Sequence, residues 1–161
     1  AIWIDMRKCC LVTLLMLILL GPAPVQADLA AGLAAYDAGD YALARAEWQP
    51  LAQAGDPEAQ IALAGLYVQG LGLARDPAMA VYWYRQAACR GAVVAQLNLG
   101  DLYDRGLGVP RDQDKAYAWL ALAARAGHRW AKQRRDGIGR ELGDKRIAAA
   151  TASAARMLQS C

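Results

Sequence analysis

Apolar residues recur along this chain with the spacing of helices that bury one face. Between Ala59 and Tyr67 they fall at offsets 0, 4, 7 and 8, and between Ala80 and Ala88 they fall at offsets 0, 3, 4, 7 and 8. Both sets lie on one side of a helix with 3.6 residues per turn. The pattern therefore predicts two amphipathic helices, and the glycine-rich segment between them predicts a loop.

This helix pair is repeated at an interval of 36 residues, which separates Gly55, Gly91 and Gly127 at the ends of the pairs. The other recurring residues are Asp40, Asp76 and Asp112, and the pairs Ala59 and Ala95, Gln60 and Gln96, Leu63 and Leu99, Leu66 and Leu102, Tyr67 and Tyr103, and Ala80 and Ala116. A period of roughly 20–50 residues indicates a solenoid, in which each unit buries its apolar face against its neighbours. We expect Trp83 and Trp119, which share the interval, to fill the space between units.

The ends of the predicted helices carry their own signals. Asp56 before Pro57, and Asp76 before Pro77, place a capping carboxylate ahead of a proline at the first helical position. A glycine just past each second helix suits the left-handed conformation that closes a helix.

The repeat divides residues 28–161 into an abbreviated unit at 28–55, two full units at 56–91 and 92–127, and a degenerate unit with a cap at 128–161. Pro50 lies inside a predicted helix of the first unit, where we expect a kink because proline removes a backbone hydrogen bond. The last helix, over residues 147–158, is predicted to cap the open end of the array. Its apolar stripe comprises Ile147, Ala150, Ala154 and Leu158.

These residues carry a resemblance to a known family. The segment from Ala95 to His128, AQLNLGDLYDRGLGVPRDQDKAYAWLALAARAGH, resembles a Sel1-like repeat, which is related to the tetratricopeptide repeat. The segment from Ala59 to Ala92 is similar, although it has Ala64 where the next unit has glycine. The resemblance covers about residue 28 to the C-terminus and implies an all-α, right-handed α/α solenoid. It also implies an adaptor or regulatory role, which is that of most members of the family.

Residues 1–27 have the features of a cleaved signal peptide rather than of a fold. Arg7 and Lys8 supply a positive region, an apolar stretch covers residues 9–20, and small residues precede a cleavage point after Ala27. The apolar stretch is shorter than the ~20 residues that a membrane span requires. Met6 is interpreted as the start of translation, with residues 1–5 upstream. We therefore expect a periplasmic or secreted bacterial protein with no stable membrane span after cleavage.

Charge is distributed unevenly along the expected mature chain. From Asp28 to Ala124 there are 7 basic and 11 acidic residues, whereas from Arg125 to Cys161 there are 9 basic and 3 acidic residues. The basic end is interpreted as a solvated cap, and the alternative is a docking surface for an acidic partner or an anionic envelope polymer. Nucleic acid is not expected as a partner, because an exported chain without a nucleic-acid motif is a poor candidate.

The sequence contains no group of residues that predicts catalysis. His128, the only histidine, lies beside a helix-closing glycine and is interpreted as a turn residue, so no histidine-based metal site is expected. The Gly-x-Gly loops are interpreted as turns rather than phosphate sites, because no strand precedes them. Asp101 and Asp104 share a helix face, where solvated charge is far commoner than a proton or cation site. We expect no catalytic residue, no metal and no cofactor.

Two classes of function remain. The first is a non-enzymatic module that binds a segment of another protein on a concave face lined by the first helix of each unit. By analogy with tetratricopeptide repeats, its inward residues are expected to be Asp37, Glu58, Gln69, Asn98, Asp101, Asp104, Arg105, Trp130, Gln133 and Arg134. The second is a cell-wall-associated protein similar to cysteine-rich, β-lactam-binding or β-lactam-hydrolysing members of the family. Those members have a cysteine pair in each repeat, and this chain has none of that kind.

Two cysteines remain after the predicted cleavage, and we expect them not to bond to each other. Cys89 falls on the side of its helix opposite Ala80. Its repeat equivalents, Gln53 and Arg125, are polar, so it is predicted to face solvent. Cys161 follows a capping helix that is expected two repeats further along the array. Helices pack about 8–10 Å apart, whereas a disulfide needs Cα atoms within ~7 Å. A free thiol or an intermolecular bond through Cys161 is the expectation.

Overall fold

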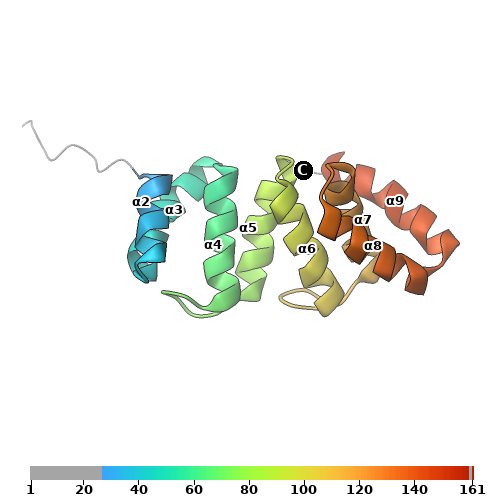
Figure 1. Cartoon of the computed structure of the whole chain (residues 1–161), viewed down its shortest axis with the longest axis horizontal. Coiled ribbons are helices and arrows are strands. Elements are labelled where there is room, and N and C mark those ends of the chain that lie inside the picture. Colours follow the sequence, from blue (N-terminus) through green and yellow to red (C-terminus); the bar gives the residue numbers. More distant parts are fainter. Residues whose placement is uncertain (1–26, 160) are drawn as a thin grey trace, which may run out of the picture.

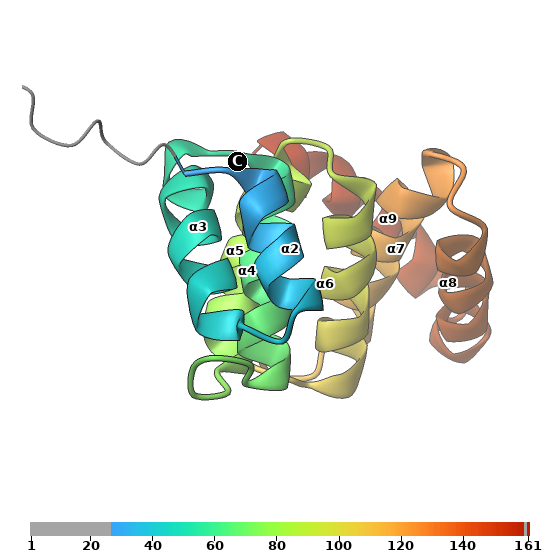
Figure 2. The same cartoon turned by 60° about the vertical axis from the view of Figure 1, so that its left-hand side comes forward.

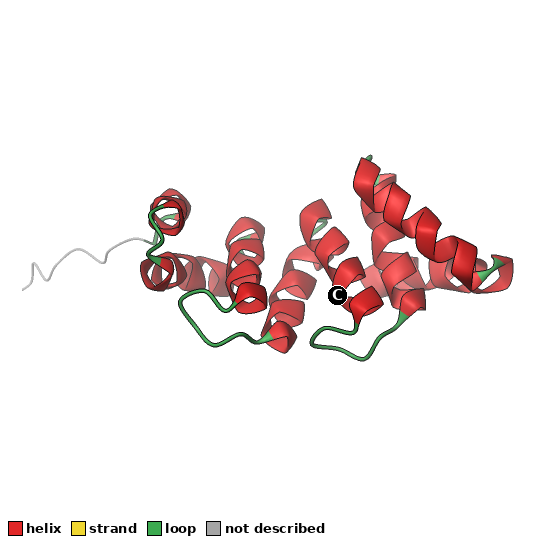
Figure 3. Cartoon of the chain, turned by 60° about the horizontal axis from the view of Figure 1, so that its bottom comes forward, coloured by secondary structure: helices red, strands yellow, loops and turns green. Residues whose placement is uncertain are grey.

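The structure of the chain, a computed structural model, describes residues 27–159 and 161. Within these residues the chain forms helices, turns and loops but no strand, which confirms the predicted all-α class (Figure 3). The helices are α2 (Leu29–Asp37), α3 (Tyr41–Ala54), α4 (Pro57–Gln69), α5 (Pro77–Cys89), α6 (Val93–Arg105), α7 (Gln113–Arg125), α8 (Arg129–Leu142) and α9 (Asp144–Gln159). Except for Ala27, the predicted signal peptide lies outside the described residues.

Successive helices pack side by side and form a right-handed α/α solenoid (Figures 1 and 2). Helices α2, α4, α6 and α8 are the first helices of the four pairs, and each packs against the second helix that follows it and, from α4 onward, against the one that precedes it. The long α4–α5 and α6–α7 loops lie along the same edge of the array (Figures 1 and 3). The predicted solenoid is therefore confirmed.

Aspartates cap the helices at the positions that the sequence predicted. The Asp56 carboxylate accepts a hydrogen bond from the backbone N–H of Ala59 at 2.8 Å, and the Asp76 carboxylate accepts one from Ala78 at 3.0 Å. Asp28, Asp40 and Asp112 cap α2, α3 and α7 in the same way. The predicted left-handed glycines are also present, with φ values of 98°, 84° and 88° at Gly55, Gly91 and Gly127.

The core is built from tryptophans set between small residues. Trp119 is 1% exposed and Trp83 is 8% exposed, as expected for side chains that fill the interior. Helices α6 and α7 approach so closely that a Cβ atom on Gly100 would lie 2.5 Å from Cγ of Leu120. Pro50 lies inside α3 as predicted, and the kink expected there stays a prediction.

Two buried glutamines link each unit to the one before it. The Gln60 side-chain amide donates to the carbonyl oxygen of Ala52 at 3.0 Å, and that of Gln96 donates to the carbonyl oxygen of Ala88 at 3.3 Å. These carbonyls belong to the last turns of α3 and α5, where each also accepts the backbone N–H of the closing glycine, Gly55 or Gly91. The recurrence of glutamine at this position is therefore structural.

Each long loop contacts the start of a helix in the preceding unit through a glycine. A Cβ atom on Gly72 would lie 2.6 Å from the backbone carbon of Tyr41, and one on Gly108 would lie 2.3 Å from that of Pro77. Both glycines also have positive φ, at 67° and 72°. Glycine is required here for two reasons, because a side chain would be strained and would meet fixed backbone atoms.

We expect Gly108→Ala to lower the free energy of unfolding by ~3 kcal/mol, from left-handed strain together with displacement of the Pro77 backbone. Gly127→Ala is the matched control, since its φ is 88° but nothing lies within 4 Å of the added Cβ. It should cost only the strain, about 1–2 kcal/mol. Urea unfolding followed by circular dichroism compares the two variants, and equal losses would contradict the role given to the loop contact.

The terminal helix lies differently from the prediction. Helix α9 starts two residues after α8 ends and runs back across α7, against which it packs more extensively than against α8 (Figure 1). Ala150 and Ala154 are buried as expected, but Leu158 is 38% exposed and does not belong to the buried stripe. The helix therefore covers α7 instead of only closing the end of the array.

This path brings the two cysteines together in a disulfide, with Cα atoms of Cys89 and Cys161 5.6 Å apart. The prediction that they do not bond is wrong because it placed the last helix two repeats beyond Cys89. A helix of 16 residues is about 24 Å long, so by running backwards α9 carries the tail to the end of α5. Cys89 is accordingly half-buried rather than facing solvent.

Candidate functional site

An ion-pair cluster joins the first helices of the last two pairs, α6 and α8. Its centre is Arg134, whose Nη2 lies 2.9 Å from Oδ2 of Asp104 and 3.6 Å from Oδ1 of Asp101. Asp101 also pairs with Arg105 at 3.0 Å, and Asp104 pairs with Arg111 at 3.5 Å. Four of the residues predicted to bind a partner, from two different helices, thus lie in one cluster.

A tryptophan lies beside this cluster. Trp130, at the start of α8, is 47% exposed, and the guanidinium carbon of Arg134 lies 5.6 Å from the centre of its ring. A cation at this distance from an indole face is held by the ring's quadrupole. Trp130 is therefore oriented by its neighbour while much of its surface stays in contact with solvent.

These side chains line a hollow of about 480 Å³ between α6 and α8. Its walls include the predicted residues Asp104, Trp130, Gln133 and Arg134. The residues that the sequence prediction missed are Arg111, Gly137, Ile138, Arg140 and Glu141. Three arginines and two carboxylates line this hollow, so hydrogen-bond donors outnumber acceptors among its charged groups. One of the carboxylates, that of Glu141, already accepts a hydrogen bond from the side-chain amide of Gln113 at 2.7 Å.

Arg111 carried a signal in the sequence that was overlooked. It lies 36 residues after Arg75, and each arginine donates its Nε–H to a carbonyl at the end of the first helix of its pair. The acceptors are Val68 at 2.9 Å and Asp104 at 2.7 Å. Arg140 and Glu141 had no such signal, because they lie where the repeat pattern is lost.

One donor in the hollow has no partner within the described residues. The Nε atom of Arg134 is buried and makes no hydrogen bond, although the Nη2 atom of the same side chain is fully engaged. Burial of an unpaired N–H is unfavourable. Arg134 therefore keeps one hydrogen-bond donor unsatisfied.

The remaining predicted residues do not join the cluster. Asn98 is half-buried and hydrogen-bonds Tyr84, whose pKa is raised to about 12 by burial, with the Asn98 bond opposing that rise. Asp37, Glu58 and Gln69 are exposed on α2 and α4 and do not line the hollow. The Gln69 amide instead donates to the carbonyl oxygen of Gly65 in its own helix.

The described part of the chain shows no cluster of side chains suited to metal binding. No group of three or more His, Cys, Asp or Glu side chains within it is placed to hold a metal ion. His128 acts as the N-cap of α8, its Nδ1 accepting a hydrogen bond from the backbone N–H of Ala131 at 3.3 Å. None of the helices in the described residues is both long enough and apolar enough to cross a membrane.

Comparison with known proteins identifies the repeat. The family model described as the Sel1 repeat matches residues 57–91 and 93–128. One similar solved structure is that of c5321, a protective antigen present in uropathogenic Escherichia coli strains that displays an SLR fold. Its TM-score is 0.74 and its sequence identity is 27%, and the match covers 80% of this chain and 28% of that one. A Sel1 repeat protein from Oxalobacter formigenes has a TM-score of 0.64 and 30% identity, over 67% of this chain and 44% of that one.

The chain thus spans less than half the length of either structure. No curated protein matches it in sequence. The resemblance seen in the sequence, to Sel1-like repeats, is confirmed by the family model and by both structures.

Proposed function

Because this chain is a Sel1 repeat protein, we propose that it is a non-enzymatic adaptor that holds a segment of another protein on the face formed by α2, α4, α6 and α8. Sel1 repeats form a scaffold that typically mediates protein–protein interaction and is generally not catalytic. The proposal adds the location of the binding surface and the chemistry of the bound segment.

The observation that carries the proposal is the exposed Trp130 in the α6–α8 hollow. Tryptophan and arginine are the residues most enriched among those that dominate binding energy at protein interfaces. Here Trp130 lies against Arg134, whose buried Nε–H has no partner among the residues that the structure describes, and both border a hollow with polar walls. A peptide with one apolar or aromatic side chain beside an acidic or amide group matches that chemistry.

A second apolar residue extends the surface along the array. Val94 is 48% exposed and occupies in α6 the position that Trp130 occupies in α8, 36 residues later. Two exposed apolar residues on adjacent first helices suit alternate side chains of one extended segment. We therefore place the bound segment across these helices.

We also propose that the protein works in the cell envelope after removal of residues 1–27. The support for this is the order of the positive, apolar and small residues at the start of the chain, which is that of a signal peptide. The partner would then be another exported or envelope protein.

We expect Trp130→Ala and Arg134→Ala each to weaken capture of the partner by at least ~30-fold, the loss typical of a residue that dominates an interface. Charge reversal of Asp101 together with Asp104 should have a similar effect, because it leaves Arg134 without its anionic neighbours. The measurement is a quantitative pull-down from envelope extract with the purified variants.

Arg135→Ala is the matched control, because Arg135 is the next residue along α8 but pairs with Asp136 and does not line the hollow. It should capture the partner as the unaltered protein does. Circular dichroism establishes that all variants keep their helices. Capture that survives Trp130→Ala and Arg134→Ala would exclude this face as the binding surface.

A further inference from the structure

Helix α5 exposes a stripe of residues whose counterpart on α7 is covered. On α7, Ala118, Ala121 and Leu122 are at most 8% exposed, and α9 is the helix that lies across α7 there. The residues 36 positions earlier are Tyr82, Arg85 and Gln86. Tyr82 is 50% exposed and Arg85 is exposed, so no helix of the described residues covers this side of α5.

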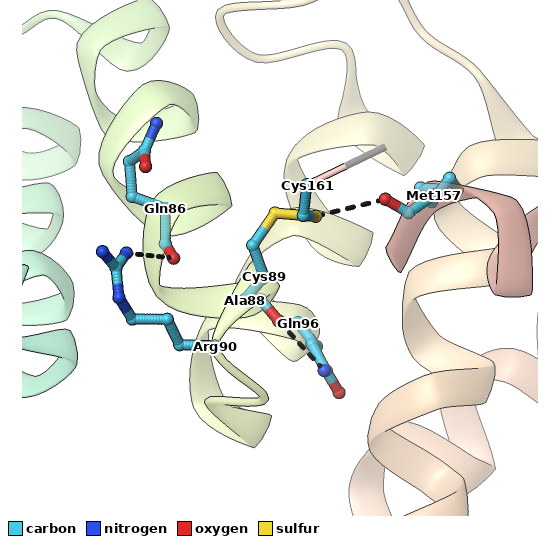
Figure 4. Close-up of a disulfide and its surroundings, with 7 residues drawn as sticks. All are labelled: Gln86, Ala88, Cys89, Arg90, Gln96, Met157 and Cys161. Atoms are coloured by element: carbon cyan, nitrogen blue, oxygen red, sulfur yellow. Dashed lines mark hydrogen bonds between the residues drawn. A yellow bond between two sulfur atoms is a disulfide. The ribbon is translucent and has the colours of Figure 1, made fainter. Parts of the chain in front are cut away.

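The C-terminal end of α9 forms one wall of a hollow beside this stripe. The hollow has a volume of about 610 Å³, and its walls are Arg85, Gln86, Cys89 and Arg90 from α5 and Met157, Leu158 and Cys161 from the end of the chain. The Cys89–Cys161 disulfide joins the two walls covalently (Figure 4). The hollow is therefore held open in advance of any ligand, which reduces the entropy lost on binding.

The arginine side chains of this hollow have no acidic side chain beside them. Two arginines line it and no Asp or Glu does. Arg90 donates to the carbonyl oxygen of Gln86 at 3.1 Å, whereas Arg85 has no hydrogen bond or ion pair within residues 27–159 and 161. In the hollow at the other end of α9, by contrast, Arg146 pairs with Asp114 at 3.0 Å.

We propose that this surface, formed by Tyr82, Arg85 and Gln86 of α5 and Leu158 of α9, binds an amphipathic helix of a partner protein that carries acidic residues beside its apolar ones. Helix α9 shows that this side of a second helix accepts a further helix, since it lies on the matching stripe of α7. Tyr82 and Leu158, which is 38% exposed, supply apolar contact. The unpaired charge of Arg85 selects an acidic helix.

A second copy of α9 would fit this surface poorly. Its basic residues, Lys145, Arg146 and Arg156, would approach two arginines of the same charge. Like charges brought together at an interface oppose binding. The acidity of the bound helix is therefore the distinguishing feature of the proposal.

The probe is a synthetic 16-residue peptide with the sequence of α9, except that the positions of Lys145, Arg146 and Arg156 carry glutamate. A peptide with the unaltered α9 sequence serves as its matched counterpart. Titration of the disulfide-bonded protein, followed by isothermal calorimetry, should give micromolar binding of the acidic peptide and at least tenfold weaker binding of the basic one. Arg85→Glu and Tyr82→Ala should each weaken binding of the acidic peptide by tenfold or more.

Arg129→Glu changes the net charge as Arg85→Glu does but lies on α8, outside this hollow, so it should bind the acidic peptide normally. The proposal would be overturned if the acidic peptide did not bind, if the two peptides bound equally well, or if Arg129→Glu weakened binding of the acidic peptide as much as Arg85→Glu does.

Sedimentation of the protein alone tests whether a second copy of the chain occupies the same surface. Self-association abolished by Arg85→Glu would show that a second copy occupies the surface, and this too would overturn it.

Discussion

Trp119→Ala should lower the free energy of unfolding by about 3–5 kcal/mol, the usual cost of truncating a large aromatic side chain in a packed core. Trp119 is 1% exposed and lies in α7, which packs against α6, α8 and α9, so its truncation would leave a cavity in the core of the array. Urea unfolding monitored by circular dichroism measures the difference.

Trp130→Ala is the comparison, because Trp130 is 47% exposed and borders the α6–α8 hollow rather than the core. Its truncation should cost no more than ~1 kcal/mol, as for most surface substitutions. Similar losses at the two positions would show that Trp130 supports the fold, and its assignment to a binding surface would then be wrong.

Reduction of the Cys89–Cys161 disulfide should lower the free energy of unfolding by ~4 kcal/mol. The bond links residues 72 apart in the sequence. A disulfide that closes a loop lowers the conformational entropy of the unfolded chain, which contributes about 3 kcal/mol for a 15-residue loop and about 4.7 kcal/mol for a 100-residue loop. Urea unfolding with and without a dithiol reductant measures the effect. Cys89→Ser cannot form the bond, so it should have the stability of the reduced protein both with and without the reductant. If the reductant still destabilised this variant, the stability change could not be assigned to the disulfide.

Intact-mass measurement addresses the same bond directly. The unreduced monomer should be two hydrogens lighter than the dithiol form, and its two described cysteines should take up no alkylating reagent until it is reduced. Uptake before reduction would restore the free thiols that the sequence alone predicted.

The repeated helix pairs could be predicted because the residues that determine each pair lie within its own unit and recur in the next unit. The caps at Asp56 and Asp76, the left-handed Gly91 and the buried Trp119 all depend on residues within about one repeat. Such local determinants are visible in one sequence, since spacing alone places them on a helix face.

The end of the chain could not be predicted, because α9 has no repeat partner to define where it packs. Its alanine-rich stripe fits equally well against the end of the array or across α7, and only packing decides between the two. The direction of α9 then determines the Cys89–Cys161 bond. A regularly continued array would have kept Cys161 far from Cys89, and the reversed direction of α9 is why the predicted separation was wrong.

The candidate site was predicted in part for a similar reason. Positions beside the core stripe of α6 and α8 gave Asp101, Asp104, Trp130 and Arg134, which the structure brings together. Arg140 and Glu141 lie beyond the point where the repeat loses its pattern, so no spacing pointed to them. Asn98 was placed on the correct helix, but its contact with Tyr84 depends on how α6 packs against α5.

Binding of a partner on the face formed by α2, α4, α6 and α8 can be tested by hydrogen–deuterium exchange of the protein with and without its purified partner. We expect slower exchange on partner binding within residues 93–105 and 129–142, which form α6 and α8, and little change in α3. Slower exchange confined to the second helices, with α6 and α8 unchanged, would contradict binding on the face of the first helices.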